Sequence, residues 1–381
     1  MRRLILILLA SSVPLLGCST VEKLNPFAGS SKNKPAELVD IKASTDLRKL
    51  WQVSVGSAGE YSFSPAVVGN SVFAASRDGT VARFEGGSQK WRVSTRQSLS
   101  GGVGSDGNVV VVGTEKGEVL ALDAGDGHLL WKTRVSSEVL AAPAVAAGLV
   151  VVRSGDSRVF GFDATDGRRN WVYQRSTPAL SLRSTAGLLI VGQLTLAGFP
   201  GGKLVAIANN NGAAVWEITI ALPKGATELE RVADITSSPV VSGSTVCAAA
   251  FQGRVSCFDG MSGNILWSRD MSSSAGVDMD DRYVYATDDK GSVHALDRAS
   301  GASVWKQDKL FMRGLTRPIA LGNYVAVADE FGMVHLLSRT DGSFAARAST
   351  DGGAVRVEPV HFGKGFLVQT ANGGVYSFEI F

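Results

Sequence analysis

The sequence is poor in charged residues, and this shortage excludes one large class of proteins. Only 19% of the 381 residues are charged, and the formal net charge is +3. Removal of a leader that carries Arg2 and Arg3 would leave about +1. A nucleic-acid-binding domain usually presents a strongly basic surface, and here the aromatic residues stand singly and are not interleaved with Lys and Arg. We therefore expect no nucleic acid among the partners.

Catalytic motifs are also missing. The sequence contains no Walker A, metalloprotease or α/β-hydrolase signature, and its four histidines are scattered. Residues 102–107 match the dinucleotide pattern GxGxxG, but they lie between strand patterns and no helix follows. His294 and His335 occupy similar positions in successive repeats and would approach a central channel, where we interpret them as structural. We predict no cofactor and no enzyme activity.

A calcium loop is not expected either. Asp278, Asp280 and Asp281 are clustered, but they lack the glycine and the terminal glutamate of such a loop. We interpret them as a solvated turn and predict no metal site.

Only three cysteines are present, and two of them lie in one predicted hairpin. A two-residue turn around residues 252–253 would place Cys247 and Cys257 on opposite faces of the sheet, whereas a shift by one residue would place them opposite each other. An oxidising compartment would permit a disulfide in the second case. The sequence leaves both registers open.

The N-terminal apolar run is too short to span a bilayer comfortably. It covers residues 4–16, follows paired arginines and ends in Leu-Leu-Gly before Cys18, which resembles a bacterial lipobox. We predict a signal peptide at residues 1–17 and acylation of Cys18, whose acyl chains would anchor the protein almost permanently. The alternative is an ordinary secretory leader with an incidental cysteine.

A polar segment separates this cysteine from the rest of the chain. Residues 18–45 contain several Ser, Asn, Lys and Pro residues, so we predict a lipid-anchored flexible tether. Ser19 follows the cysteine where an Asp would resemble an inner-membrane retention signal. By resemblance to that sorting rule, we expect the protein on the outer membrane, facing the periplasm.

What the sequence has in abundance is a repeat with a period near 40. The pattern Ala-x-Asp-x-x-x-Gly-x-x-x-Trp occurs in full at residues 121–131 and 295–305 and in variant form elsewhere. The seven tryptophans mark the period: Trp51, Trp91, Trp131, Trp171, Trp216, Trp267 and Trp305. Each unit contains four short alternating runs joined by tight turns, which is typical of one β-propeller blade.

Seven blades and part of an eighth can be counted from these units. We expect them near residues 62–95, 98–135, 139–175, 180–220, 236–270, 274–308 and 314–348, with the last beginning near 355. The last unit lacks a Trp strand, and residues 47–53 form a Trp strand without a blade. We therefore predict an all-β, eight-bladed β-propeller of four-stranded antiparallel blades at residues 46–381. The N-terminal strand would pair with the C-terminal blade and close the ring.

The tryptophans are interpreted as packing residues between blades, because a large ring fills the widening space there. In the seventh unit Ala346 stands where Trp is expected, and we predict that Phe344 replaces it. Two segments break the period: a long hairpin expected at residues 193–202 and a long connection at residues 221–234. Such insertions are candidates for binding.

The repeat resembles the tryptophan-docking motif of quinoprotein alcohol dehydrogenases, whose propellers bind pyrroloquinoline quinone and Ca²⁺. This chain lacks their adjacent cysteine pair and a recognisable cluster of their calcium ligands. The lipobox, length and repeats together resemble the BamB (YfgL) family, lipoproteins of the outer-membrane β-barrel assembly machinery. The segments LSLR at residues 180–183 and ERVADITSSP at residues 230–239 strengthen this resemblance, which covers nearly the whole chain.

The resemblance implies a partner and a set of contact residues. In that family the two segments contact the periplasmic POTRA domains of the barrel insertase. Leu180 and Leu182 would be apolar anchors, and Arg183 with Asp234 would form charged contacts or brace the loops. The family often has a second acidic residue where this chain has Thr236.

These observations lead to the expectation of a non-enzymatic scaffold. It would bind the insertase, sit on the outer membrane through its lipid anchor, and assist the assembly of β-barrel proteins, with unfolded outer-membrane proteins as further partners. One alternative is a periplasmic dehydrogenase that depends on pyrroloquinoline quinone and Ca²⁺. Another is a propeller that binds a different envelope ligand, such as a polysaccharide.

Overall fold

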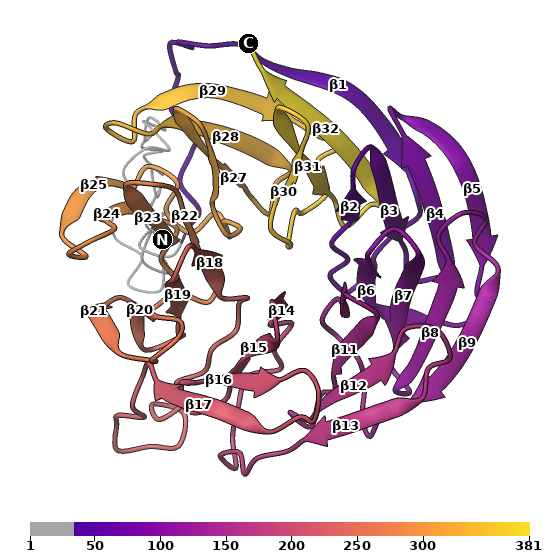
Figure 1. Cartoon of the computed structure of the whole chain (residues 1–381). Coiled ribbons are helices and arrows are strands. Elements are labelled where there is room, and N and C mark those ends of the chain that lie inside the picture. Colours follow the sequence, from indigo (N-terminus) through magenta and orange to yellow (C-terminus); the bar gives the residue numbers. More distant parts are fainter. Residues whose placement is uncertain (1–33) are drawn as a thin grey trace, which may run out of the picture. The chain divides into compact units, whose positions relative to one another are not determined.

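The structure, a computed structural model, describes residues 34–381. These residues form eight four-stranded antiparallel sheets arranged around a central axis (Figure 1). The predicted eight-bladed propeller is therefore confirmed. Within the described residues, no helix is long and apolar enough to cross a membrane. The predicted signal peptide, Cys18 and most of the predicted tether lie outside the described residues.

The first four blades follow the chain. Blade 1 consists of β2 (Ala66–Val68), β3 (Ser71–Ala75), β4 (Thr80–Glu85) and β5 (Ser88–Ser94). Blade 2 consists of β6 (Leu99–Ser105), β7 (Val109–Thr114), β8 (Glu118–Asp123) and β9 (Leu129–Arg134). Blade 3 consists of β10 (Ala144–Ala146), β11 (Leu149–Arg153), β12 (Val159–Asp163) and β13 (Arg169–Tyr173). Blade 4 consists of β14 (Leu188–Val191), β15 (Leu194–Phe199), β16 (Lys203–Ala208) and β17 (Ala214–Thr219).

The remaining blades complete the ring. Blade 5 consists of β18 (Val240–Ser242), β19 (Thr245–Ala249), β20 (Arg254–Asp259) and β21 (Ile265–Asp270). Blade 6 consists of β22 (Gly276–Met279), β23 (Tyr283–Thr287), β24 (Val293–Asp297) and β25 (Ser303–Gln307). Blade 7 consists of β26 (Ile319–Leu321), β27 (Tyr324–Ala328), β28 (Met333–Ser338) and β29 (Phe344–Ser349). Blade 8 consists of β30 (Val360–Phe362), β31 (Gly365–Gln369), β32 (Gly374–Ile380) and β1 (Leu47–Ser54).

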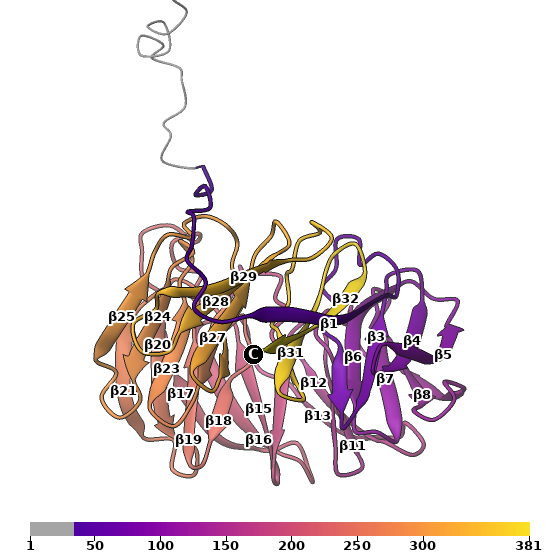
Figure 2. The same cartoon turned by 90° about the horizontal axis from the view of Figure 1, so that it is seen from above.

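Blade 8 closes the ring as predicted. Its edge strand β1 comes from the N-terminal side of the chain and pairs antiparallel with β32, from Leu47 opposite Ile380 to Ser54 opposite Gly374. Figure 2 shows β1 lying along β32 at the rim of the ring. This pairing joins the two ends of the propeller chain and leaves no gap between the last blade and the first.

In blades 1 to 6, a tryptophan connects the blade to the next one through one hydrogen bond. The indole Nε1 atoms of Trp91, Trp131, Trp171, Trp216, Trp267 and Trp305 donate to the carbonyl oxygens of Ala124, Ala164, Asn209, Gly260, Arg298 and Arg339 at 2.7–3.1 Å. Each acceptor belongs to the following blade, so the rings dock between blades. The packing role predicted for these tryptophans agrees with this geometry.

The motif glycine serves this docking as well as the turn. Gly167 has a φ of +70°, and a Cβ built on it would lie 2.6 Å from the ring of Trp131 in the preceding blade. The motif aspartate completes the turn: Asp123 Oδ1 accepts from the N–H of Gly125 at 2.7 Å. In the turn of blade 3, Asp163 Oδ1 likewise accepts from the Thr165 N–H at 2.8 Å. The Trp of one blade and the Asp and Gly of the next therefore form one inter-blade joint.

Blade 7 packs differently from the prediction. Ala346 does occupy the Trp position, because it lies opposite Leu336 on β28. Phe344 does not replace the missing ring, since a bulge in β29 turns it toward the cluster between blades 6 and 7. Ala346 faces blade 8, where Phe366 and Phe378 stack with ring centroids 5.6 Å apart and supply the missing volume.

The predicted long hairpin at residues 193–202 is also wrong. Residues 194–199 are strand β15, which pairs on both sides with β14 and β16. The alternation in this segment is that of an ordinary strand, and only residues 200–202 turn. The extra residues of this region lie instead in two connections, residues 174–187 before blade 4 and residues 220–239 after it.

The cysteine register is settled by the fold. Cys247 on β19 lies directly opposite Cys257 on β20, with their Cα atoms 4.1 Å apart, and the two form a disulfide. The turn between the strands therefore has the register that brings the two thiols together.

The acidic cluster in blade 6 is structural and largely buried, which corrects the interpretation as a solvated turn. Asp278 accepts from the Ala320 N–H at 2.8 Å, and Asp280 accepts from the Tyr285 hydroxyl at 2.7 Å. Only Asp281 is well exposed, and it pairs with Arg339. These carboxylates join blade 6 to blade 7.

His294 and His335 each contact an aspartate six residues earlier in the chain. His294 Nε2 lies 2.9 Å from Asp288, and His335 Nε2 lies 3.0 Å from Asp329. This pairing supports their interpretation as structural residues.

Candidate partner-binding face

The connections between blades gather on one face of the ring, here called the connection face. Each runs from the edge strand of one blade to the innermost strand of the next. Parts of five such connections line one funnel of about 360 Å³ at the centre of this face, including Thr185, Thr236 and Arg317. The turns that carry the motif glycines lie at the opposite ends of the strands. The two segments singled out in the sequence, residues 180–183 and 230–239, both belong to the connection face.

Asp234 holds these two segments together. Its carboxylate accepts from the Leu182 N–H at 2.7 Å and from the Gly201 N–H at 2.9 Å, and the residue is only 1% exposed. One oxygen thus fixes the connection before blade 4, and the other fixes the β15–β16 turn. Because the carboxylate is buried and both its oxygens accept backbone hydrogen bonds, Asp234 stabilises the connection face and does not itself contact a partner.

Arg153 lies close to this buried carboxylate. Burial lowers the pKa of its guanidinium to about 10, and the nearby charge of Asp234 opposes that shift. The guanidinium also donates to the Gly198 carbonyl and lies 5.2 Å from the ring centroid of Phe199. A buried guanidinium and a buried carboxylate therefore lie near each other beneath the two connections.

Arg183 does not pair with Asp234. Its guanidinium forms a two-pronged ion pair with Glu138, with distances of 3.0 Å from Nε and 2.7 Å from Nη2. It also lies 5.6 Å from the ring centroid of Tyr61. The hydrogen bonds with Glu138 raise the pKa of Arg183 above its usual value. Arg183 thus links the connection before blade 4 to the connections before blades 3 and 1, while more than half of its side chain stays exposed.

Leu180 and Leu182 present apolar surface next to this ion pair. They are 40% and 37% exposed, although the backbone of Leu182 is held by Asp234. Exposed leucines on a fixed backbone are suited to contact a partner, because little conformational entropy is lost on binding.

Sequence reasoning missed a second exposed apolar group on the same face. Leu222 and Leu229, on the connection after blade 4, are 66% and 72% exposed. The loop that carries Leu229 is closed by Glu230, whose Oε2 accepts from the N–H groups of Ala226 and Thr227 at 2.8 and 3.1 Å. The spacing of Thr227 and Glu230 is that of a capping box, and this signal was present in the sequence.

One group of possible metal ligands lies on the opposite face. Asp123, Asp126 and His128 come together in the motif turn of blade 2. Their carboxylates accept hydrogen bonds from backbone N–H groups of that turn, so the cluster is explained by the turn itself. It gives no reason to expect a metal.

Comparison with known proteins identifies the family. The model described as outer membrane protein assembly factor BamB matches residues 77–307. The protein of that name from Burkholderia pseudomallei is 43% identical over 93% of this chain and 94% of its own length. The one from Escherichia coli is 35% identical over 99% of both chains.

Solved structures give the same picture. The crystal structure of BamB from Moraxella catarrhalis has a TM-score of 0.82 and 29% identity, and covers 88% of this chain and all of its own. A quinohemoprotein alcohol dehydrogenase from Comamonas testosteroni has a TM-score of 0.70 at 14% identity, over 87% of this chain and 76% of its own, which shows a shared fold alone. The chain belongs to the family of the outer membrane protein assembly factor BamB, and not to the quinone-dependent dehydrogenases whose fold it shares.

Proposed function

We propose that this protein is a lipid-anchored scaffold that binds the POTRA domains of the outer-membrane barrel insertase through the connection face. Leu180 and Leu182 make the apolar contacts, and Arg183 makes a charged contact at the edge of the same surface. Asp234 acts from inside, by holding the backbone of residue 182. The name shared by the relatives supports the general role in outer-membrane protein assembly.

The observation that carries the proposal is the pair of hydrogen bonds to Asp234. A buried carboxylate between two irregular connections is costly unless it is well satisfied. Here it fixes a surface whose outward side chains are apolar. This combination of a fixed backbone and apolar outward side chains supports a binding role for the two connections.

Binding of the purified POTRA domains tests this assignment. We expect the double variant Leu180→Ser, Leu182→Ser to weaken binding at least tenfold in calorimetric titration, with the melting temperature unchanged. The matched control is Leu129→Ser on the rim of blade 2, where the leucine is 52% exposed. The control should bind as the wild type does. Equal affinities for all three proteins would contradict the proposal.

The lipid anchor is part of the same proposal. We expect Cys18→Ser to abolish acylation, which intact-mass spectrometry reads directly, and to release the protein from the membrane fraction. An unmodified Cys18 in the mature wild-type protein would contradict the anchor, but would leave the binding face untouched.

A further inference from the structure

Residues 35–46, here called the strap, lie against blades 6 and 7 although the sequence predicts a flexible tether up to residue 45. The Ala36 N–H donates to the carbonyl of Phe311 at 2.8 Å, and the Ser44 N–H donates to the carbonyl of Ala345 at 2.9 Å. Figure 2 shows this segment passing β28 and β29 before it enters β1. Both ends of the strap are therefore attached to the propeller.

Two arginines of the propeller donate hydrogen bonds to backbone carbonyls of the strap. Arg313 donates to the Ala36 carbonyl at 3.1 Å, and Arg347 donates to the Val39 carbonyl at 3.0 Å. Leu38 packs against the apolar cluster between blades 6 and 7, which contains Trp305. A segment with backbone bonds, two charged donors and a half-buried leucine is a docked element, and its ordering is compensated by these contacts.

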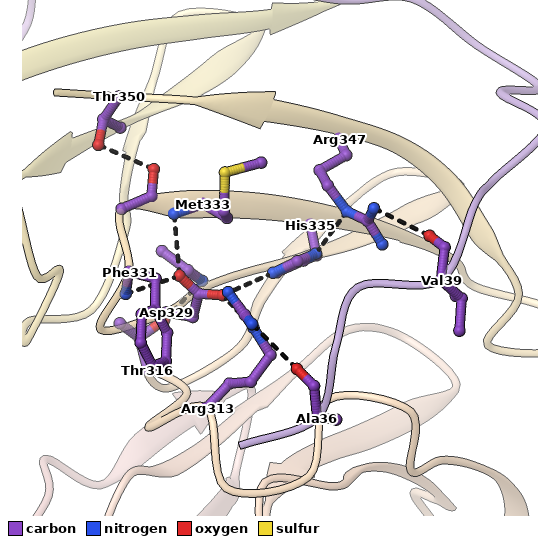
Figure 3. A network of polar contacts seen from close by, with 12 residues as sticks. Ala36, Val39, Arg313, Thr316, Asp329, Phe331, Met333, His335, Arg347 and Thr350 are labelled. Atoms are coloured by element: carbon purple, nitrogen blue, oxygen red, sulfur yellow. Dashed lines mark hydrogen bonds and ion pairs between the residues drawn. The ribbon is translucent and has the colours of Figure 1, made fainter. Parts of the chain in front are cut away.

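The two arginines belong to a buried polar network (Figure 3). Asp329 is fully buried and accepts from Arg313 at 2.7 Å, while His335 contacts the same carboxylate oxygen at 3.0 Å. Arg347 Nε donates to His335 Nδ1 at 3.2 Å. Since Nδ1 accepts, Nε2 carries the proton and donates to Asp329. The network therefore fixes both guanidinium groups in the position from which they reach the strap.

Blade 7 is also the blade without a motif tryptophan. Ala346 stands at the Trp position of the edge strand β29, and the next residue, Arg347, is the one that reaches the strap.

The strap leads to the connection face. Ala36 is bonded to Phe311, and the same connection continues to Leu315 and Thr316, which line the central funnel together with Thr185 and Thr236. Blade 7 lies across the ring from blades 3 and 4, which flank residues 180–183 (Figure 1). Ala36 therefore lies at the edge of the connection face, across the ring from Leu180 and Leu182.

We propose that the strap docks on the rim of blade 7 to orient the propeller, so that the connection face is turned toward the membrane. This inference rests on the proposed lipid anchor at Cys18. With the strap docked, only residues 18–34 separate the proposed anchor from the first attached part of the chain. An undocked tether up to residue 45 would leave the propeller more freedom to rotate.

Docking of the strap is tested by hydrogen exchange of the full lipoprotein in detergent. We expect residues 35–46 to exchange at least tenfold more slowly than residues 19–33. Leu38→Ser and Arg347→Ala should each remove this protection, whereas the matched control Glu37→Ser, at an exposed neighbour, should retain it. Equal exchange of the two segments in the wild type would overturn the docking.

Orientation is tested on vesicles that contain a quenching lipid. A fluorophore is attached either at Lys224→Cys on the connection face or at Ser262→Cys on the opposite face. We expect stronger quenching at position 224, and loss of the difference in Leu38→Ser. Equal quenching at both positions, or a difference that survives Leu38→Ser, would overturn the orientation.

The hydrogen-exchange and quenching experiments together distinguish a failure of this inference from a failure of the proposed function. A protein that does not float with the vesicles would overturn the anchor and the orientation, while the exchange experiment would still judge the docking. Binding of POTRA domains in solution should be the same for Leu38→Ser and wild type, because the strap is remote from residues 180–183. A loss of binding in that variant would show that the strap acts on the binding face and not on orientation.

Discussion

The two faces of the ring differ in how regular they are. On the face opposite the connection face, where the turns with the motif glycines lie, the docking of Trp onto the next turn recurs. Its indole hydrogen bonds vary only between 2.7 and 3.1 Å. On the connection face, neighbouring segments differ in length and each has its own contacts. Stability is thus distributed over repeated joints, whereas the candidate binding surface depends on a few unique residues such as Asp234.

Loss of one joint should have the largest effect on stability. Trp131→Ala removes a buried ring and its bond to the Ala164 carbonyl, and buried Trp to Ala changes cost about 3–5 kcal/mol. We expect the free energy of unfolding in urea to fall by that amount. Affinity for POTRA domains, measured well below the melting temperature, should be unchanged, because the joint is on the other face. If Trp131→Ala lowered both the stability and the affinity, the two faces would not be independent.

Loss of the brace at Asp234 should reduce both stability and binding. Asp234→Ala removes the carboxylate near the buried Arg153 and leaves the N–H groups of Leu182 and Gly201 without their acceptor. We therefore expect the free energy of unfolding to fall by about 3 kcal/mol. Unlike Trp131→Ala, this variant should also lose binding and show faster hydrogen exchange in residues 180–183. Retained affinity would show that the position of Leu182 does not depend on Asp234.

A charge swap at Arg183 distinguishes a direct contact with the partner from a role in holding the connections in place. Arg183→Glu should weaken binding about tenfold with little change in melting temperature, since exposed ion pairs contribute about 1 kcal/mol or less. The double variant Arg183→Glu, Glu138→Arg restores an ion pair with reversed charges. If Arg183 contacts the partner, the double variant should remain weak. Full recovery of affinity would assign Arg183 to bracing.

The smallest expected effect is a pH dependence at blade 7. Burial lowers the pKa of His335 below 6.5, and the nearby charges are Asp329, Arg313 and Arg347. The folded state favours the neutral ring, so this stability is present above pH 6.5 and is lost as the pH falls through the folded pKa. Between pH 6.5 and 5.5, we expect the free energy of unfolding to fall by at most about 1.4 kcal/mol because of this group. His335→Gln should have a shallower dependence of the unfolding midpoint on pH, and an equal slope would contradict this assignment.

Much of the fold could be predicted from the sequence, because the tryptophans and alternating runs are local signals. The eight blades, the closure by β1 and the position of Ala346 followed from the period alone. The exceptions had two causes. The side on which Phe344 lies depends on a bulge in β29 that reverses the alternation between residues 344 and 346. The docking of residues 35–46 depends on Arg313 and Arg347, which are far away in the sequence.

The candidate site was predictable only in part. Residues 180–183 and Asp234 came from a family resemblance, and no local pattern would have shown that Asp234 is buried beneath them. The partners Glu138, Tyr61 and Arg153 belong to other blades, so their contacts appear only in the folded ring. The capping box at Thr227 and Glu230 was the one local signal that had been present and overlooked.

The central claim is that the irregular face binds the insertase. Site-specific photo-crosslinking in intact cells tests it most directly, with a photoreactive residue at position 182 and, for comparison, at position 129 on the rim. We expect an insertase adduct at position 182 and none at position 129. An adduct at position 129 alone, or no adduct at position 182 when the protein is present at wild-type levels, would contradict it.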